Sequence, residues 1–196
     1  MRAKAPVAAL GFTVKSGWTS AVLVAGPVGE PRLVDSRRVE ISDPGVPESR
    51  QPYHEGFGTA RGKTAVLARL VASVERFGAE SVGAFIAAHE ASYALRGAGL
   101  VVGSVIDPDT IANDHIRIHA LEGRLFREVV RTAASARGVD CVVWRERDLY
   151  AAAAALFLQQ EAALKGRVTA MGQQVEGPWR AEHKAAAMAA LMILAR

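Results

Sequence analysis

The sequence has a single cysteine and no long uninterrupted apolar run, and these two absences exclude several classes of protein. Because Cys141 has no second cysteine to pair with, the sequence forms no internal disulfide, which is typical of proteins from a reducing compartment. It contains no stretch of about 18 apolar residues that would predict a membrane-spanning helix, and no targeting signal is recognisable. We therefore expect a soluble, cytoplasmic protein.

The common catalytic signatures are absent as well. There is no Gly-x-Ser-x-Gly elbow, no Cys-x-x-Cys pair and no dinucleotide-type glycine fingerprint, which excludes the commonest hydrolase, zinc-ribbon and dehydrogenase patterns. The segment 58–64 (GTARGKT) is similar to a phosphate-binding P-loop, but it has three residues between its glycines where the motif needs four. It also follows a Pro- and Gly-rich stretch instead of a strand. We interpret it as a loop that leads into a helix.

The composition is that of a globular protein. Half of the 196 residues are apolar and 22% are charged, and 24 basic against 20 acidic residues give a net charge of +4. This length fits one domain that buries roughly 70% of its extended surface without help from disulfides or a structural metal. We expect a single domain over residues 1–196, with a long loop at about 42–62 and C-terminal helices over 148–196. A charge of +4 permits nucleic-acid binding without requiring it.

Hydrophobic periodicity predicts three consecutive strands, then helices that alternate with two further strands. The first two strands are joined by a short Gly-containing turn, and the third has polar residues on both faces, as an edge strand does. Segment 79–96 is ambiguous between helix and strand. The predicted strands are 6–15, 18–25, 32–41, 100–106 and 139–144, and the predicted helices are 63–77, which Gly78 ends, 115–137, and two in the final segment divided at 166–179. This order predicts an α/β fold, a mixed five-stranded sheet with helices on its faces.

Two histidines in one predicted helix form a candidate metal site. His115 and His119 are four residues apart, so they share a helix face, and Asp107 is close in sequence. Imidazole and carboxylate groups at this spacing suit a divalent ion. A polar helix surface is the alternative. His54, in the long loop, is a further candidate because functional loops carry such residues.

Basic residues form a candidate nucleic-acid surface. Arg117, Arg124 and Arg131 recur every seven residues, so they form a stripe along one helix that would follow a phosphate backbone. We add Lys15, at the first turn, to this candidate surface. The alternative is a solvated helix face whose charge is balanced by acidic neighbours.

Several strings, taken in their order, resemble the ribonuclease H-like superfamily, and within it the RuvC-type Holliday-junction resolvases. Residues 9–18 (ALGFTVKSGW) look like the first strand and turn of that fold. The string 105–107 (VID), with Asn113 and the helix up to Gly138, is similar to its fourth strand and following helix. The segment 182–190 (EHKAAAMAA) resembles the alanine-rich helix that carries the last acidic residues of the family.

The resemblance implies two-metal phosphodiester hydrolysis, with Mg²⁺ or Mn²⁺ held by carboxylates. The first-strand aspartate of the family corresponds most nearly to Thr13, which is no charged ligand. Asp107 would represent the fourth-strand acid, and Glu182 and His183 the acids of the last helix. Because this carboxylate set is incomplete, we predict a degenerate relative that binds DNA or RNA without cutting it.

Two alternatives to this prediction remain. One is an active nuclease with a rearranged Asp/His site for an ion such as Mn²⁺ or Zn²⁺. The other is an assembly module, such as a homodimer formed through the apolar last helix, 185–194, although core packing is the favoured explanation of that helix.

Overall fold

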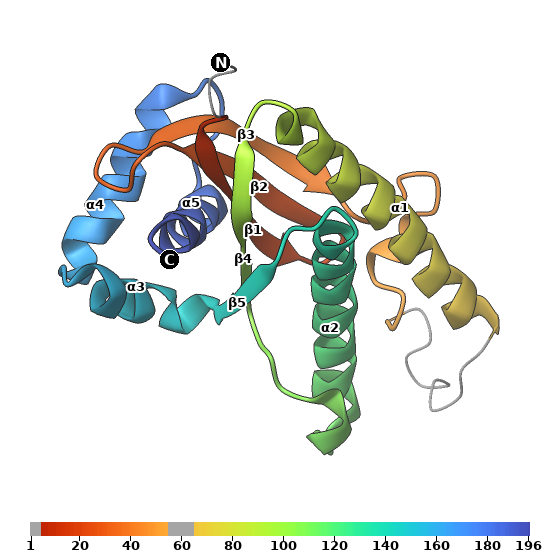
Figure 1. The fold of residues 1–196 in the computed structure, drawn as a ribbon. Helices are drawn as coiled ribbons and strands as arrows, with labels where there is room; N and C mark the ends of the chain where they lie inside the picture. Colours follow the sequence, from red (N-terminus) through yellow and green to blue (C-terminus); the bar gives the residue numbers. More distant parts are fainter. Residues whose placement is uncertain (1–4, 55–64) are drawn as a thin grey trace.

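A five-stranded mixed sheet with helices on both faces forms the centre of the fold (Figure 1). The computed structural model describes residues 5–54 and 65–196. The strands are β1 (Val7–Lys15), β2 (Trp18–Ala25), β3 (Arg32–Glu40), β4 (Ala94–Val102) and β5 (Cys141–Arg145). The helices are α1 (Ala65–Glu90), α2 (Asp114–Ser135), α3 (Leu149–Phe157), α4 (Glu161–Met171) and α5 (Ala181–Leu194), with short 3₁₀ turns η1 (Pro47–Arg50), η2 (Pro108–Thr110), η3 (Glu146–Asp148) and η4 (Gly172–Gln174).

The strand order is β3-β2-β1-β4-β5. Strands β1, β2 and β3 pair antiparallel, whereas β4 is parallel to both β1 and β5. The turn between β1 and β2 uses Gly17 at φ +80°, a left-handed conformation that glycine adopts without strain. The predicted mixed α/β sheet, its first hairpin and the edge position of the third strand are therefore confirmed. No helix in the described parts of the chain is long and apolar enough to cross a membrane.

Strand β1 contributes to two separate cores because successive side chains point to opposite faces of the sheet. Leu10 and Phe12 pack in the core that α1 and α2 cover, whereas Ala9 belongs to the core around α5. Figure 1 shows α1 and α2 on one side of the sheet and α3, α4 and α5 on the other. Thr13 lies on the same side of β1 as Ala9, facing α5, and its side chain is fully buried.

Helix α5 lies directly against β1 and β4 because both strands have a glycine beneath it. Gly11 and Gly99 are partners in the parallel register. A Cβ added at Gly11 would lie 1.9 Å from the carbonyl oxygen of Ala186, and one at Gly99 would lie 2.7 Å from the Cβ of Ala189. Residues 185–194 are all buried within the chain. The last helix is thus a core helix and has no exposed apolar face to offer a second copy.

Three predicted boundaries are wrong, and two of the errors come from glycines that serve packing. Gly78 does not end a helix, because α1 continues to Glu90. A Cβ there would lie 2.4 Å from Val129 Cγ1, so the glycine permits close contact with α2. Strand β4 covers 94–102 instead of 100–106, since Gly97 and Gly99 lie within it. The C-terminal segment has three helices, and Leu158, at φ 54°, ends α3.

The long predicted loop is described up to residue 54, and it contains η1. Its remainder, together with the P-loop-like segment 58–64, lies outside the described residues. The lone thiol, Cys141, is half-buried in β5, and burial raises its pKa to about 11. It is therefore protonated at neutral pH, the less nucleophilic form of a thiol.

Candidate functional site

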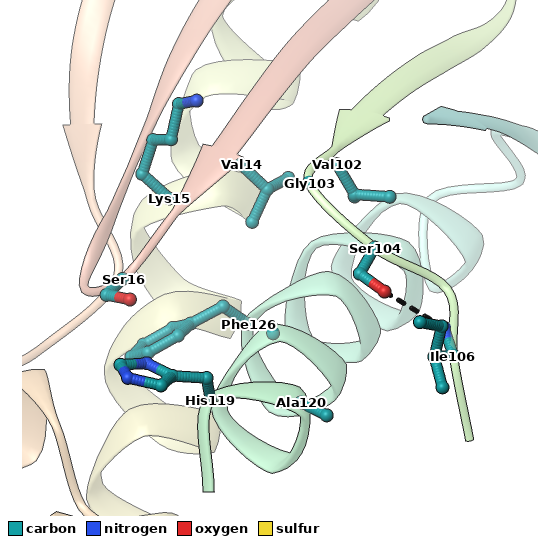
Figure 2. A pocket seen from close by; sticks show the side chains of 11 residues that line it. Val14, Lys15, Ser16, Val102, Gly103, Ser104, Ile106, His119, Ala120 and Phe126 are labelled. Atoms are coloured by element: carbon teal, nitrogen blue, oxygen red, sulfur yellow. Dashed lines mark hydrogen bonds between the residues drawn. The ribbon is translucent and has the colours of Figure 1, made fainter. Parts of the chain in front are cut away.

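A pocket of about 260 Å³ lies where β1 and β4 end side by side. The carboxyl ends of adjacent parallel strands meet at one sheet edge, which is a common place for ligands. The pocket is lined by Val14, Lys15, Ser16, Val102, Gly103, Ser104, Ile106, His119, Ala120, Gly123 and Phe126. Figure 2 shows Ser16, His119 and Phe126 on one side and Ser104 and Ile106 on the other. None of these eleven lining residues carries a carboxylate.

On the α5 face of the same edge, Thr13 is already engaged. Its hydroxyl donates a hydrogen bond to the carbonyl oxygen of Glu182, at 2.8 Å. Lys15, two residues further along β1, forms an ion pair with Glu146 at the end of β5, at 2.9 Å. Sequence reasoning missed Glu146, which precedes α3 in a charged turn. A divalent cation beside Thr13 would therefore meet a hydroxyl committed elsewhere and a carboxylate, that of Glu146, already paired with Lys15.

His183 is a buried residue at the first turn of α5. Its Nδ1 accepts a hydrogen bond from the backbone N–H of Arg180, at 3.3 Å, and its ring lies 5.9 Å from that of Trp179. Burial lowers the pKa of His183; the Glu182 carboxylate opposes this shift and Arg180 adds to it. The neutral ring therefore caps the helix. Glu182 is less buried and lines a separate pocket with residues of β2 and β3, among them Trp18 and Arg38.

The lowered pKa of His183 predicts a pH effect on stability. The unfolded chain binds this proton near pH 6.5 and the folded chain binds it at a lower pH, so stability decreases as pH falls through that interval. We expect the free energy of unfolding, measured by urea denaturation from pH 7.5 to 5, to fall less steeply for His183→Gln than for the wild type. Parallel pH profiles for the two proteins would show that this histidine contributes nothing to the effect.

Asp107 lies outside the sheet edge. Strand β4 ends at Val102, and Asp107 follows in an exposed connection where its carboxylate accepts a hydrogen bond from the N–H of Asp109, at 3.1 Å, and caps η2. Its other neighbour is Arg124 of α2, at 3.8 Å. Among the described residues, no hydrogen bond or ion pair joins Asp107 to Glu182 or His183. The expectation that Asp107 ends a strand is wrong, because the strand stops five residues earlier.

These positions do not fit a carboxylate centre for two Mg²⁺ or Mn²⁺ ions. Such ions require several carboxylate or carbonyl oxygens directed at one point. The Thr13 hydroxyl donates a hydrogen bond to a backbone carbonyl, Asp107 caps the short turn η2, and His183 caps α5.

The predicted arginine stripe follows α2, and each member has an acidic neighbour. Arg117 lies 3.7 Å from Asp109, Arg124 pairs with Asp107, and Arg131 lies 2.6 Å from Glu128. The side chains of these arginines are 40–49% exposed. Ion pairs at this exposure are worth less than about 1 kcal/mol, so a phosphate is able to compete for the guanidinium groups.

Three histidines come together at the start of α2. His115 and His119 lie with their Nε2 atoms 3.1 Å apart, and the ring centroid of His54 is 4.7 Å from that of His119. Glu122, one turn further along α2, is fully buried and contacts Nδ1 of His54 at 2.9 Å. The sequence identified the two helical histidines and His54 separately. Sequence reasoning missed Glu122 as part of this site, and the structure does not place the predicted ligand Asp107 in the cluster.

Comparison with known proteins identifies the fold. No protein-family model and no curated protein matches the sequence. Among solved structures, the chain is similar to Thermus thermophilus RuvC in complex with a Holliday junction substrate, with a TM-score of 0.56 and 14% identity over 95% of this chain and 91% of that one. A second Thermus thermophilus RuvC structure gives a TM-score of 0.53 and 13% identity over 95% and 92%. The chain has a RuvC-like fold.

The RuvC-like fold confirms the α/β prediction, which came from hydrophobic periodicity, and the fold that the resemblance implied. The match covers nearly all of both chains, so it includes the hairpin, the parallel strands and the C-terminal helices. At this low identity it establishes the fold alone, and the role of each residue in this RuvC-like chain has to follow from its own contacts.

Proposed function

We propose that this protein binds nucleic acid through the phosphate backbone and does not cleave it with Mg²⁺ or Mn²⁺. The observation that carries the proposal is the pocket where β1 and β4 end. Its described lining includes Lys15, His119 and two serines, and none of the described lining residues carries a carboxylate. Hydroxyl and imidazole groups suit a phosphate oxygen better than a hard cation, while the Lys15 ammonium pairs with Glu146 on the α5 face of β1.

The arginine stripe extends this surface along α2. It consists of Arg117, Arg124 and Arg131 on the helix that also supplies one wall of the pocket. Three positive charges in line match the regularly spaced phosphates of a nucleic-acid backbone. When they neutralise phosphates, the nucleic acid releases bound counterions, so the affinity depends on salt concentration. The net charge of +4 adds a general attraction at low ionic strength.

The residues at the sheet edge support the proposed lack of metal-dependent cleavage. Two-metal hydrolysis needs carboxylates to hold the ions that activate water and stabilise the leaving oxygen. Here the β1 position is a threonine whose proton is directed at the Glu182 carbonyl. Lys15 places a positive charge on the same face of the strand, where it pairs with Glu146.

The test is fluorescence anisotropy with labelled four-way junction, duplex and single-stranded DNA and RNA over a range of salt concentrations. The four-way junction is included because one structural neighbour is RuvC with a Holliday junction. If the three arginines each neutralise one phosphate, log K should fall against log salt with a slope of about −2.7 or steeper for duplex substrates. Absence of binding at low salt, or affinity that salt does not change, would contradict the proposal.

A further inference from the structure

We infer that His54, His115 and His119 form a binding site for a Zn²⁺ ion. The inference depends on the geometry of these residues and not on the proposed nucleic-acid function. Each ring offers one nitrogen, and these nitrogens all lie within 4.8 Å of one another. The cluster joins two parts of the chain, since His54 follows η1 whereas the other two belong to the first turns of α2.

The spacing of the rings fits a common metal ion. The two Nε2 atoms of His115 and His119 are 3.1 Å apart, and two nitrogens at 2.0–2.1 Å from a tetrahedral zinc would be separated by roughly 3.3 Å. The ring of His54 meets both others at a steep angle, with centroid distances of 6.0 Å to His115 and 4.7 Å to His119. The rings are thus edge-to-face instead of stacked, and their nitrogens lie within 4.8 Å of one another.

Glu122 provides an independent observation. Its side chain is buried to 98%, its Oε1 lies 2.9 Å from Nδ1 of His54, and its Oε2 has no hydrogen-bond partner among the described residues. A buried carboxylate with an unpaired oxygen is costly unless charge nearby compensates it. A carboxylate that accepts a hydrogen bond from one ring nitrogen fixes the histidine tautomer and leaves the other ring nitrogen free to bind a metal. Glu122 therefore orients His54, and a bound cation would compensate its charge.

The ligand set selects the metal. Three imidazoles, with no oxygen ligand in the cluster among the described residues, suit zinc and related transition metals better than Mg²⁺. Three protein ligands leave the fourth tetrahedral position for a water molecule or an anion. His119 also lines the pocket at the ends of β1 and β4, so this metal would lie next to the surface that we propose for phosphate.

The experiment measures metal binding alone, without nucleic acid. The protein, freed of metal with EDTA, is titrated with Zn²⁺ by calorimetry and with Co²⁺ as a spectroscopic probe of tetrahedral nitrogen ligation. We expect one ion per chain. The variants His115→Asn and His119→Asn, both at exposed positions, should lose about 100-fold or more in affinity, and Glu122→Gln should lose about 10- to 100-fold.

His89→Asn is the matched control. His89 is a histidine on α1 whose ring pairs with Asp35 at 2.8 Å, away from the cluster, so its replacement should leave zinc affinity unchanged. Circular dichroism verifies that each variant is folded. Absence of stoichiometric zinc binding, or wild-type affinity in His119→Asn, would overturn the inference. Neither result depends on whether the protein binds nucleic acid, so the two proposals fail separately.

Discussion

Replacement of Gly11 by alanine is expected to destabilise the protein by about 3 kcal/mol or more, toward the upper end of the cost of overpacking a core. The added Cβ would lie 1.9 Å from the Ala186 carbonyl oxygen and 2.7 Å from its carbonyl carbon. Both are backbone atoms, so no rotation of a side chain relieves the clash. Helix α5 would have to move away from β1, which separates buried surfaces over the length of the helix. Urea denaturation measures the change.

Gly123→Ala is the control for this prediction. Gly123 lies in α2, and a Cβ there would meet no atom of the described residues within 4 Å other than its own helix backbone and its two chain neighbours. Alanine is favoured over glycine in a helix by about 1 kcal/mol, so this variant should be as stable as the wild type or slightly more stable. Equal stability of Gly11→Ala and Gly123→Ala would contradict the close contact between α5 and the sheet.

Replacement of Arg117, Arg124 and Arg131 by glutamine in one variant is expected to reduce the salt dependence of nucleic-acid binding. Each phosphate contact contributes about 0.9 to the slope of log K against log salt for duplex DNA, so the slope should decrease in magnitude by about 2.7. Affinity at low salt should fall by more than 10-fold. The measurement is anisotropy with labelled duplex and four-way junction DNA at several salt concentrations.

Arg137→Gln is the matched control for the arginine stripe. Arg137 follows α2 at the opposite end and pairs with Glu90 of α1, at 2.8 Å. It carries the same charge but lies away from the pocket. A salt slope in the triple variant that equals that of Arg137→Gln would show that the stripe has no contact with phosphate.

Much of the fold follows from local sequence patterns, because its strands and helices have clear periodicity. The hairpin was predictable from alternating apolar residues around Gly17, and the parallel strands from apolar runs between helices. The errors at Gly78 and in β4 have one cause. These glycines accommodate a neighbouring helix or strand, and a contact between distant segments leaves no local signal that separates it from a helix stop or a turn.

The candidate site was less predictable than the fold. The i, i+4 spacing of His115 and His119 indicated a shared face, which the structure confirms. The approach of His54 depends on the path of the chain after β3, and the burial of Glu122 depends on how α2 packs. Asp107 looked like a strand-end acid because the apolar residues Val105 and Ile106 precede it, yet both are exposed after the strand has ended.

The most direct test of the proposed function is a single sample in which binding and cleavage of a labelled four-way junction are measured together, with Mg²⁺ or Mn²⁺ present. Anisotropy reports the complex, and a denaturing gel of the same sample reports any cut strand. We predict a salt-sensitive complex in which the junction stays intact with either ion. Cleavage that requires the added ion and is lost in Asp107→Asn or Glu182→Gln would contradict the proposal, because these residues would then form a working carboxylate site.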